Sequence, residues 1–273
     1  MIIKTLSEDT SISNDFDCEH GLSLYIETQD QKVLFDVGAG KVFFENAKRL
    51  NVDISDVDIL IISHGHNDHG GGLETFFEKN SKAGVYIHHL AFEKYYAMRE
   101  NEVSEFIGLD KELKQKEQII PTSDRFFISK GIQVFSNIAY QKPHETANKG
   151  LFAEQNGMII DDTFAHEQNL VIDDNGKKIL ITGCAHNGIV NILKHFHSLQ
   201  GCMPDYVVGG FHLKGCIGRD SDVKYLNQIS EYLLGTKAKY YTCHCTGTNA
   251  YNHMKEIMGG NIDYLSAGSE ITI

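Results

Sequence analysis

The stretch that decides the fold is Ile59-Leu60-Ile61-Ile62-Ser63-His64-Gly65-His66-Asn67-Asp68-His69-Gly70-Gly71-Gly72. The apolar run from Val57 to Ile62 predicts a buried β-strand that ends at Ser63. Three histidines and an aspartate follow within six residues. We therefore expect them on the loop that leaves the carboxyl end of a core strand, a position where loops carry function. The glycines would give this loop the backbone freedom that a tight turn needs.

The residue types in this loop are those that bind metal ions. Imidazole nitrogens and carboxylate oxygens are ligands of zinc, iron and manganese. The spacing allows His64 and His66 to bind one metal ion while Asp68 and His69 face a second. A histidine-rich polar surface loop is the alternative interpretation, and the position directly after a buried strand argues against it.

The composition limits the class of protein. The chain has 273 residues, of which 41% are hydrophobic and 23% charged, with a net charge of −12. This acidic balance argues against nucleic acid and anionic membranes as partners. Six cysteines without a Cys-x-x-Cys motif, no signal-peptide pattern and no apolar run of about 18 residues favour a cytoplasmic protein with reduced thiols. We expect a small-molecule substrate, and a homo-oligomer is compatible with the sequence.

The order of predicted elements indicates a single domain over residues 1–273. Each half of the chain has strands that end in ligand-type residues and continue into helices. Residues 91–130 are charged and helical in pattern, which predicts a solvated helical insertion. Residues 137–157 are polar and irregular, and such a long loop is often a lid.

Three further histidines end predicted strands in the second half: His186, His212 and His244. A site for two metal ions needs six or more donors, so we expect His186 and His244 to be ligands. His212 can be a ligand, a proton donor or a substrate contact. Cys184 is either a ligand or a small packed residue, and we favour packing. The lesser candidates are Glu167 as a carboxylate, His20 as a residue lining the cleft, and His88, His89 and His144 as structural histidines.

Several motifs together resemble one family. They are the His-x-His-x-Asp-His signature with Thr182-Gly183-Cys184-Ala185-His186-Asn187-Gly188-Ile189, Gly209-Gly210-Phe211-His212 and His244-Cys245-Thr246-Gly247. The chain resembles the metallo-β-lactamase superfamily, in the branch of bacterial metal-dependent hydrolases related to the archaeal dihydropterin-ribofuranosyl-aminobenzene-phosphate synthase. The resemblance implies an α+β fold, the four-layer αββα sandwich. It also implies six metal ligands: His64, His66, Asp68, His69, His186 and His244. Cys184 stands where the superfamily often has a bridging aspartate.

The expected activity follows from these motifs. Two divalent metal ions, zinc with iron or manganese as alternatives, would provide a metal-bound hydroxide that hydrolyses a phosphoester, lactone or thioester. Asp68 would orient the hydroxide, and His212 would be a further catalytic residue. Helices predicted after the ligands favour an anionic substrate. One alternative is a transferase that joins a dihydropterin methyl diphosphate to an aminobenzene ribofuranosyl phosphate. A second is a non-catalytic or redox metal protein.

Overall fold

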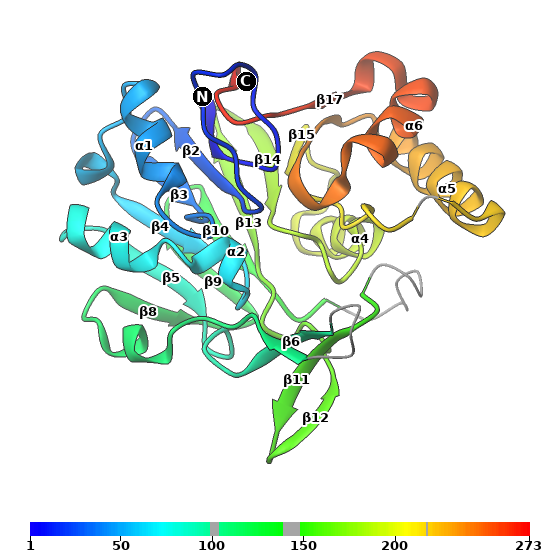
Figure 1. Ribbon diagram of the computed structural model, residues 1–273. Coiled ribbons are helices and arrows are strands. Elements are labelled where there is room, and N and C mark those ends of the chain that lie inside the picture. Colours follow the sequence, from blue (N-terminus) through cyan, green and yellow to red (C-terminus); the bar gives the residue numbers. More distant parts are fainter. Residues whose placement is uncertain (99–103, 139–147, 217) are drawn as a thin grey trace. The chain divides into compact units, whose positions relative to one another are not determined.

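The computed structural model describes residues 1–98, 104–138, 148–216 and 218–273. The chain forms two compact units, and most of their helices and strands are labelled in Figure 1. The first unit contains residues 1–124, 150–168 and 266–273, and the second unit contains residues 125–149 and 169–265. Each unit is thus assembled from segments that are distant in the sequence. The expectation of one domain over residues 1–273 stays a prediction.

A seven-stranded sheet forms the centre of the first unit. Its strands, in spatial order, are β18 (Glu270–Thr272), β1 (Ile2–Ser7), β2 (Ser23–Glu27), β3 (Lys32–Phe35), β4 (Ile59–Ile62), β5 (Gly84–His88) and β8 (Ile119–Thr122). Strands β3, β4, β5 and β8 pair in parallel, and the remaining pairs are antiparallel. The residues that follow the parallel strands therefore lie at one edge of this sheet.

Helices bury their apolar side chains against this sheet. They are α1 (Val42–Arg49), α3 (Leu73–Lys79) and the two 3-10 helices η1 (Ile54–Asp56) and η2 (Lys111–Gln115). The polar one-turn helix α2 (Asn67–Gly70) also belongs to this unit. Phe43 and Ala47 lie one turn apart on α1 and are fully buried. They share a core with Phe76 of α3 and with Leu60 and Ile62 of β4. The alternate residues Leu60 and Ile62 point to the same face of β4, which is the face that the helices cover.

The first unit also has a four-stranded sheet, and here the predicted helical insertion is wrong. The strands are β12 (Met158–Asp161), β11 (Leu151–Gln155), β6 (Tyr95–Met98) and β7 (Ser104–Phe106). Within residues 91–130, only η2 is helical among the described residues. Tyr95 and Ala97 are buried against Ile107, which is the two-residue alternation of a strand. Their pairing partner, Leu151–Ala153, lies more than 50 residues away in the sequence, where local patterns give no information about it.

The predicted lid over residues 137–157 is described only in part. Residues 139–147, which include His144, lie outside the described residues. The later part is not an irregular loop, because Leu151–Gln155 forms β11 and pairs with both β6 and β12.

The second unit repeats the same type of sheet. Its strands, in spatial order, are β17 (Ile262–Tyr264), β16 (Lys239–Thr242), β15 (Tyr206–Gly209), β14 (Lys177–Thr182), β13 (Asn169–Asp174), β10 (Ile132–Phe135) and β9 (Arg125–Ser129). Strands β14 to β17 pair in parallel, whereas β13, β10 and β9 are antiparallel. The residues after β14, β15 and β16 consequently lie at one edge of the second unit's sheet.

Three long helices cover a face of this second sheet. The helical segments are α4 (Ile189–Gln200), α5 (Asp220–Thr236), η3 (His244–Thr246), α6 (Thr248–Met258) and η4 (Gly259–Asn261). Phe196 of α4, Leu233 of α5 and Met254 of α6 pack in one core with Val207 and Tyr240 of the strands. The predicted helix after Gly188 and the helix through Met254 are both present. Among the described residues, no helix combines the length and the apolar character that a membrane crossing requires.

Candidate metal centre

The candidate ligands of the first unit follow β4 directly. The chain leaves the strand at Ser63, passes through His64 and His66, and begins the one-turn helix α2 at Asn67. The rings of His64, His66 and His69 are buried, whereas the Asp68 side chain is 17% exposed. The loop therefore presents imidazole groups in a dry environment beside one carboxylate that solvent can reach.

His64 and His66 are arranged as ligands of one metal ion. Nε2 of His64 lies 3.1 Å from Nδ1 of His66. Two nitrogens bound to one tetrahedral zinc ion at about 2.0–2.1 Å lie about 3.3 Å apart. Asp68 offers a carboxylate oxygen within 4.8 Å of a ring nitrogen of each of these histidines. The three side chains fit a divalent metal ion both in distance and in donor type.

The glycines after the loop are required for close packing. A Cβ on Gly72 would lie 2.2 Å from the carbonyl oxygen of Val37, and one on Gly71 would lie 2.4 Å from that of Ala39. The φ angles of Gly71 and Gly72 are −63° and −79°, which any residue can adopt. Backbone freedom is therefore not the reason for these two glycines. They let the loop that carries the candidate ligands, residues 63–69, approach the segment after β3. We refer to residues 63–69 as the metal loop.

Asp36 holds the metal loop from the end of β3, and the sequence analysis gave it no role. It is fully buried and accepts hydrogen bonds from the backbone N–H and the hydroxyl of Ser63, both at 2.7 Å. Its Oδ2 also lies 2.7 Å from Nδ1 of His69. Burial alone lowers the pKa of His69, but the carboxylates of Asp68 and Asp36 outweigh burial and raise this pKa to about 9.

A second buried pair, Asp162 and His166, also contacts the metal loop. His166 Nε2 lies 3.0 Å from Asp162 Oδ2, and the backbone N–H of Gly65 donates to His166 Nδ1 at 2.9 Å. Asp162 Oδ2 is 3.7 Å from Nε2 of His66. Burial raises the pKa of Asp162, but its interactions with His166 and His66 dominate and hold that pKa below its usual range. Neither Asp162 nor His166 was predicted from the sequence as a site residue.

In the second unit, the candidate histidines follow parallel strands. The ring centroids of His186 and His212 are 4.2 Å apart. His186 Nδ1 lies 3.0 Å from Oδ1 of Asn148, whose amide donates to the carbonyl of His186 at 2.8 Å. Three non-glycine residues after these strands have left-handed φ angles: Ala185 at 58°, His212 at 51° and His244 at 50°. Strained backbone of this kind clusters at functional sites.

Two cysteines lie beside these histidines. Cys184, His212 and Cys245 each place a donor atom within 4.8 Å of the others. The thiol of Cys245 donates to the carbonyl of Cys184 at 3.4 Å and accepts from the backbone N–H of His212 at 3.3 Å. A Cβ on Gly210 would lie 2.5 Å from Sγ of Cys245, so this position must be glycine.

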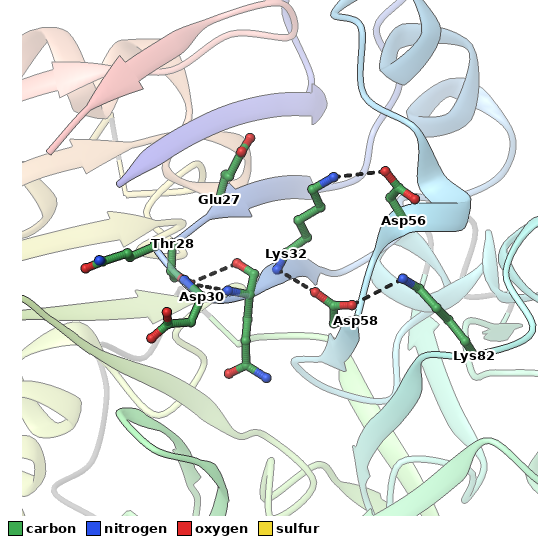
Figure 2. A pocket seen from close by; sticks show the side chains of 9 residues that line it. Glu27, Thr28, Asp30, Lys32, Asp56, Asp58 and Lys82 are labelled. Carbon is green, nitrogen blue, oxygen red and sulfur yellow. Dashed lines mark hydrogen bonds and ion pairs between the residues drawn. The ribbon is translucent and has the colours of Figure 1, made fainter.

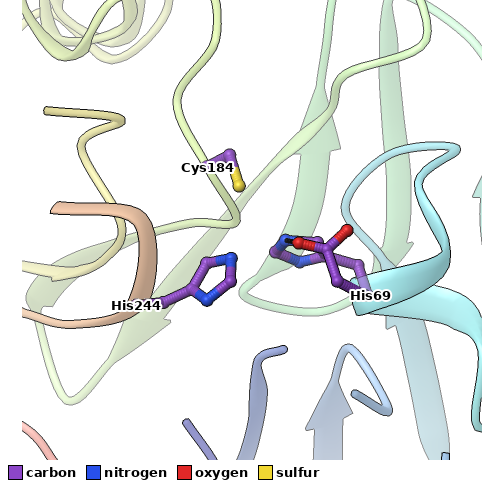
Figure 3. A group of neighbouring side chains, drawn as sticks. His69, Cys184 and His244 are labelled. Atoms are coloured by element: carbon purple, nitrogen blue, oxygen red, sulfur yellow. Dashed lines mark ion pairs between the residues drawn. The ribbon is translucent and has the colours of Figure 1, made fainter. Parts of the chain in front are cut away.

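These contacts affect the chemistry of both cysteines. Burial raises the pKa of the Cys245 thiol, but its interactions with Cys184, His212 and His244 outweigh burial and lower it. Cys184 is buried, as packing requires, and its sulfur is also a possible donor. Figure 3 shows the side chains of Cys184 and His244, which come from different segments of the second unit, and His69 of the first unit.

The lesser candidates have separate positions in the first unit. His20 places its two ring nitrogens 3.0 Å from Asp9 Oδ2 and 3.5 Å from Asp68 Oδ2. Glu167 is buried one residue after His166. His88 and His89 lie at the end of β5 with their rings tilted by 37° and the ring centroids 4.4 Å apart.

A surface pocket in the first unit lies away from the candidate ligands. It is lined by the turn between β2 and β3 and by residues just before β4 and β5 (Figure 2). Two ion pairs cross it, Lys32 with Asp56 at 2.9 Å and Lys82 with Asp58 at 3.2 Å. These residues belong to the amino-terminal ends of the parallel strands, whereas the candidate ligands follow a carboxyl-terminal end. The pocket is therefore separate from the metal loop.

Comparison with known families identifies the chain. The family model of the metallo-β-lactamase superfamily matches residues 17–213. The chain belongs to this superfamily. The matched region contains the metal loop, Cys184, His186 and His212, and the predicted α+β fold class of this superfamily is confirmed.

The most informative relatives cover the whole chain. The crystal structure of Tm1679, named a metal-dependent hydrolase of the β-lactamase superfamily, has a TM-score of 0.83 and 30% identity, covering 100% of this chain and 99% of that one. The 7,8-dihydropterin-6-methyl-4-(β-D-ribofuranosyl)-aminobenzene-5'-phosphate synthase of Methanocaldococcus jannaschii is 32% identical over 98% of this chain and 95% of its own length. An uncharacterized protein of the same archaeon is 30% identical over the full length of both chains. The expected branch of the superfamily is thereby confirmed.

Proposed function

We propose that the chain is a metal-dependent hydrolase of a small anionic substrate: a phosphoester, a lactone or a thioester. The observation that carries this proposal is the 3.1 Å separation between His64 Nε2 and His66 Nδ1, which suits two ligands of one metal ion. The similarity to Tm1679, which is named a metal-dependent hydrolase, supports the same reaction class.

The proposed cofactor is two divalent metal ions, with zinc ahead of iron and manganese. The proposed ligands are His64, His66, Asp68 and His69 in the first unit and His186 and His244 in the second. When bound, divalent metal ions activate water for nucleophilic attack and neutralise negative charge that develops on the substrate.

The side chains of the protein prepare this chemistry. Asp36 aligns His69 through Nδ1, which leaves Nε2 of that ring as the donor atom. We propose that Asp68 orients the attacking water, since its side chain is partly exposed beside buried histidines. Nδ1 of His212 is buried and makes no hydrogen bond within the described residues, and we propose that it contacts the substrate or gives it a proton.

The proposed anionic character of the substrate has two supports. Helices α4 and α6 begin three and four residues after His186 and His244, with only short turns between, and the amino terminus of a helix favours negative charge. Bound divalent metal ions would add positive charge in a chain whose net charge is −12.

A transferase is the second candidate function. The 32% identity to the archaeal synthase over nearly all of both chains favours it, and the product named for that relative carries a 5'-phosphate. The chain would then join a dihydropterin methyl diphosphate to an aminobenzene ribofuranosyl phosphate. Product analysis separates the candidates, because a transferase forms a new carbon bond between two substrates and a hydrolase transfers the cleaved group to water.

The test is a hydrolysis screen with phosphoesters, lactones and thioesters, followed by His64→Ala and Asp68→Ala variants on any substrate found. We expect either substitution to lower kcat by at least about 100-fold, because both side chains belong to the proposed metal centre. Hydrolysis that is unchanged in both variants would overturn the proposal. The control is Asp58→Asn, which alters a carboxylate of the separate surface pocket.

A further inference from the structure

His166 lies in the segment after β12, and both of its ring nitrogens make hydrogen bonds. The Gly65 N–H can only donate, so Nδ1 of His166 must accept with its lone pair. The proton of the neutral ring is therefore on Nε2, which donates to Asp162 Oδ2 at 3.0 Å. These two contacts select one tautomer and leave neither nitrogen of His166 for a metal ion.

Asp162 lies between the His166 ring and the ring of His66, one of the two proposed ligands. The oxygen that accepts from His166 also lies 3.7 Å from Nε2 of His66. Nδ1 on the opposite side of the His66 ring faces Nε2 of His64 at 3.1 Å. A carboxylate near Nε2 favours the proton on that nitrogen, so Nδ1 keeps the lone pair that a metal ion requires.

The surroundings of this pair are dry and rigid. The side chains of His66, Asp162 and His166 are at most 5% exposed. The Tyr95 ring lies 4.0 Å from the His166 ring, and its hydroxyl donates to the carbonyl of Leu90. Water is thus excluded, and the charge of Asp162 acts on the His66 ring in a medium of low dielectric constant.

The backbone of this segment adopts a strained conformation to make these contacts. Phe164 has a left-handed φ of 54°, and its N–H donates to Oδ1 of Asp162 at 2.7 Å. This turn brings the side chains of Asp162 and His166, four residues apart, within hydrogen-bonding distance of each other. Strain of this kind is retained where the geometry it produces is needed.

We propose that Asp162 and His166 are positioning residues of the His64–His66 metal centre. His166 fixes the backbone of Gly65 between the two ligands, and Asp162 sets the orientation and tautomer of the His66 ring. This inference rests on the proposed metal binding of His64 and His66 and adds two residues that are distant in the sequence, since His166 lies 101 positions after Gly65.

The first experiment measures zinc affinity by competition with a chromogenic chelator, on the full chain freed of metal. We expect Asp162→Asn and His166→Leu to bind zinc about 10- to 100-fold more weakly than the wild type. We expect His166→Gln to keep most of the affinity, because its amide can accept from Gly65 and donate to Asp162. Asp222→Asn, a buried carboxylate that caps α5 in the second unit, is the matched control and should bind zinc normally.

Several outcomes separate this inference from the proposed function. Wild-type affinity in Asp162→Asn together with loss of zinc in His64→Ala would overturn the inference and leave the metal centre standing. Zinc binding unchanged in His64→Ala would overturn both. Equal weakening in His166→Gln and His166→Leu would contradict the hydrogen-bond argument.

A second measurement does not depend on zinc or on the stability of a variant. Nitrogen-15 NMR of the imidazole groups in the metal-free wild-type protein reports which ring nitrogen carries the proton. We expect the proton on Nε2 in both His66 and His166. A proton on Nδ1 of His166 would overturn the inference, even if every substituted protein failed to fold.

Discussion

Asp36 is the residue on which the geometry of the proposed metal loop depends most. A fully buried carboxylate is stable only when it is paired and hydrogen-bonded, and Asp36 has three partners at 2.7 Å on Ser63 and His69. Asp36 itself has a left-handed φ of 60°. The folded chain thus accepts local strain at Asp36 to hold the Nδ1 edge of the His69 ring.

Replacing Asp36 with asparagine tests this role. We expect zinc affinity to fall about 10- to 100-fold, because His69 loses the carboxylate that orients its ring. The free energy of unfolding should fall by roughly 2 to 4 kcal/mol, since asparagine removes the buried negative charge that pairs with His69. Chelator competition and urea unfolding measure the two effects. Asp58→Asn, at the opposite end of the same strands, is the control, and an equal loss of zinc affinity in both variants would contradict the assignment.

The sequence predicted only part of the candidate site at this scale. His64, His66, Asp68 and His69 form a local motif whose spacing is visible without a structure. Asp36 contacts Ser63 from 27 residues away, and His166 contacts Gly65 from 101 residues away. Such contacts depend on the pairing of distant strands. The one signal available for Asp36 in the sequence was its position directly after the apolar residues Val33, Leu34 and Phe35.

At the scale of elements, close packing between the metal loop and the segment after β3 depends on glycine. The Gly72 Cα is so close to the Val37 carbonyl that an added Cβ would lie 2.2 Å from its oxygen. The contact is with backbone, which cannot move aside as a flexible side chain can. Gly71 and Gly72 therefore set the distance between the start of α3 and the segment after β3.

We expect Gly72→Ala to lower the free energy of unfolding by about 2 to 3 kcal/mol, because overpacking against backbone displaces a whole segment. Gly235→Ala is the matched control. Gly235 lies exposed in α5 with no atom within 4 Å of an added Cβ. Alanine there should instead raise the free energy of unfolding by roughly 0.5 to 1 kcal/mol. Chemical denaturation measures both, and a neutral Gly72→Ala would show that the loop is not closely packed.

Most elements could be predicted because their side chains follow a regular local pattern. Ile59–Ile62 is wholly apolar, and α1 repeats its buried residues at helical spacing. The region around Tyr95 was predicted wrongly as a helix, because its charged residues resemble a solvated helix. Its strand forms through pairing with Leu151–Gln155, and that partner is known only once the chain has folded.

At the scale of the whole molecule, buried histidines affect how stability depends on pH. Burial, followed by repulsion from His89, lowers the pKa of His88 from 6.5 to about 4. Between these values the unfolded chain binds more protons than the folded chain. His88 therefore favours folding fully above about pH 6.5, and this contribution is lost as the pH falls toward 4.

We expect the free energy of unfolding of the wild type to fall between pH 6.5 and 4, with at most about 3 kcal/mol of the loss due to His88. In His88→Gln this part of the slope should disappear. Urea unfolding at a series of pH values measures it. His197→Gln, at an exposed histidine of α4, is the control. A slope that is the same in His88→Gln as in the wild type would contradict the assignment.

The most direct test of the account is the metal content of the protein, by elemental analysis after purification without added metal or chelator. We expect about two equivalents of a divalent metal ion per chain, falling in His64→Ala and His244→Ala. Two equivalents of iron would keep the ligand assignment and favour the redox alternative. A content near zero that persists after reconstitution with zinc, iron and manganese would contradict the central claim that these residues bind metal.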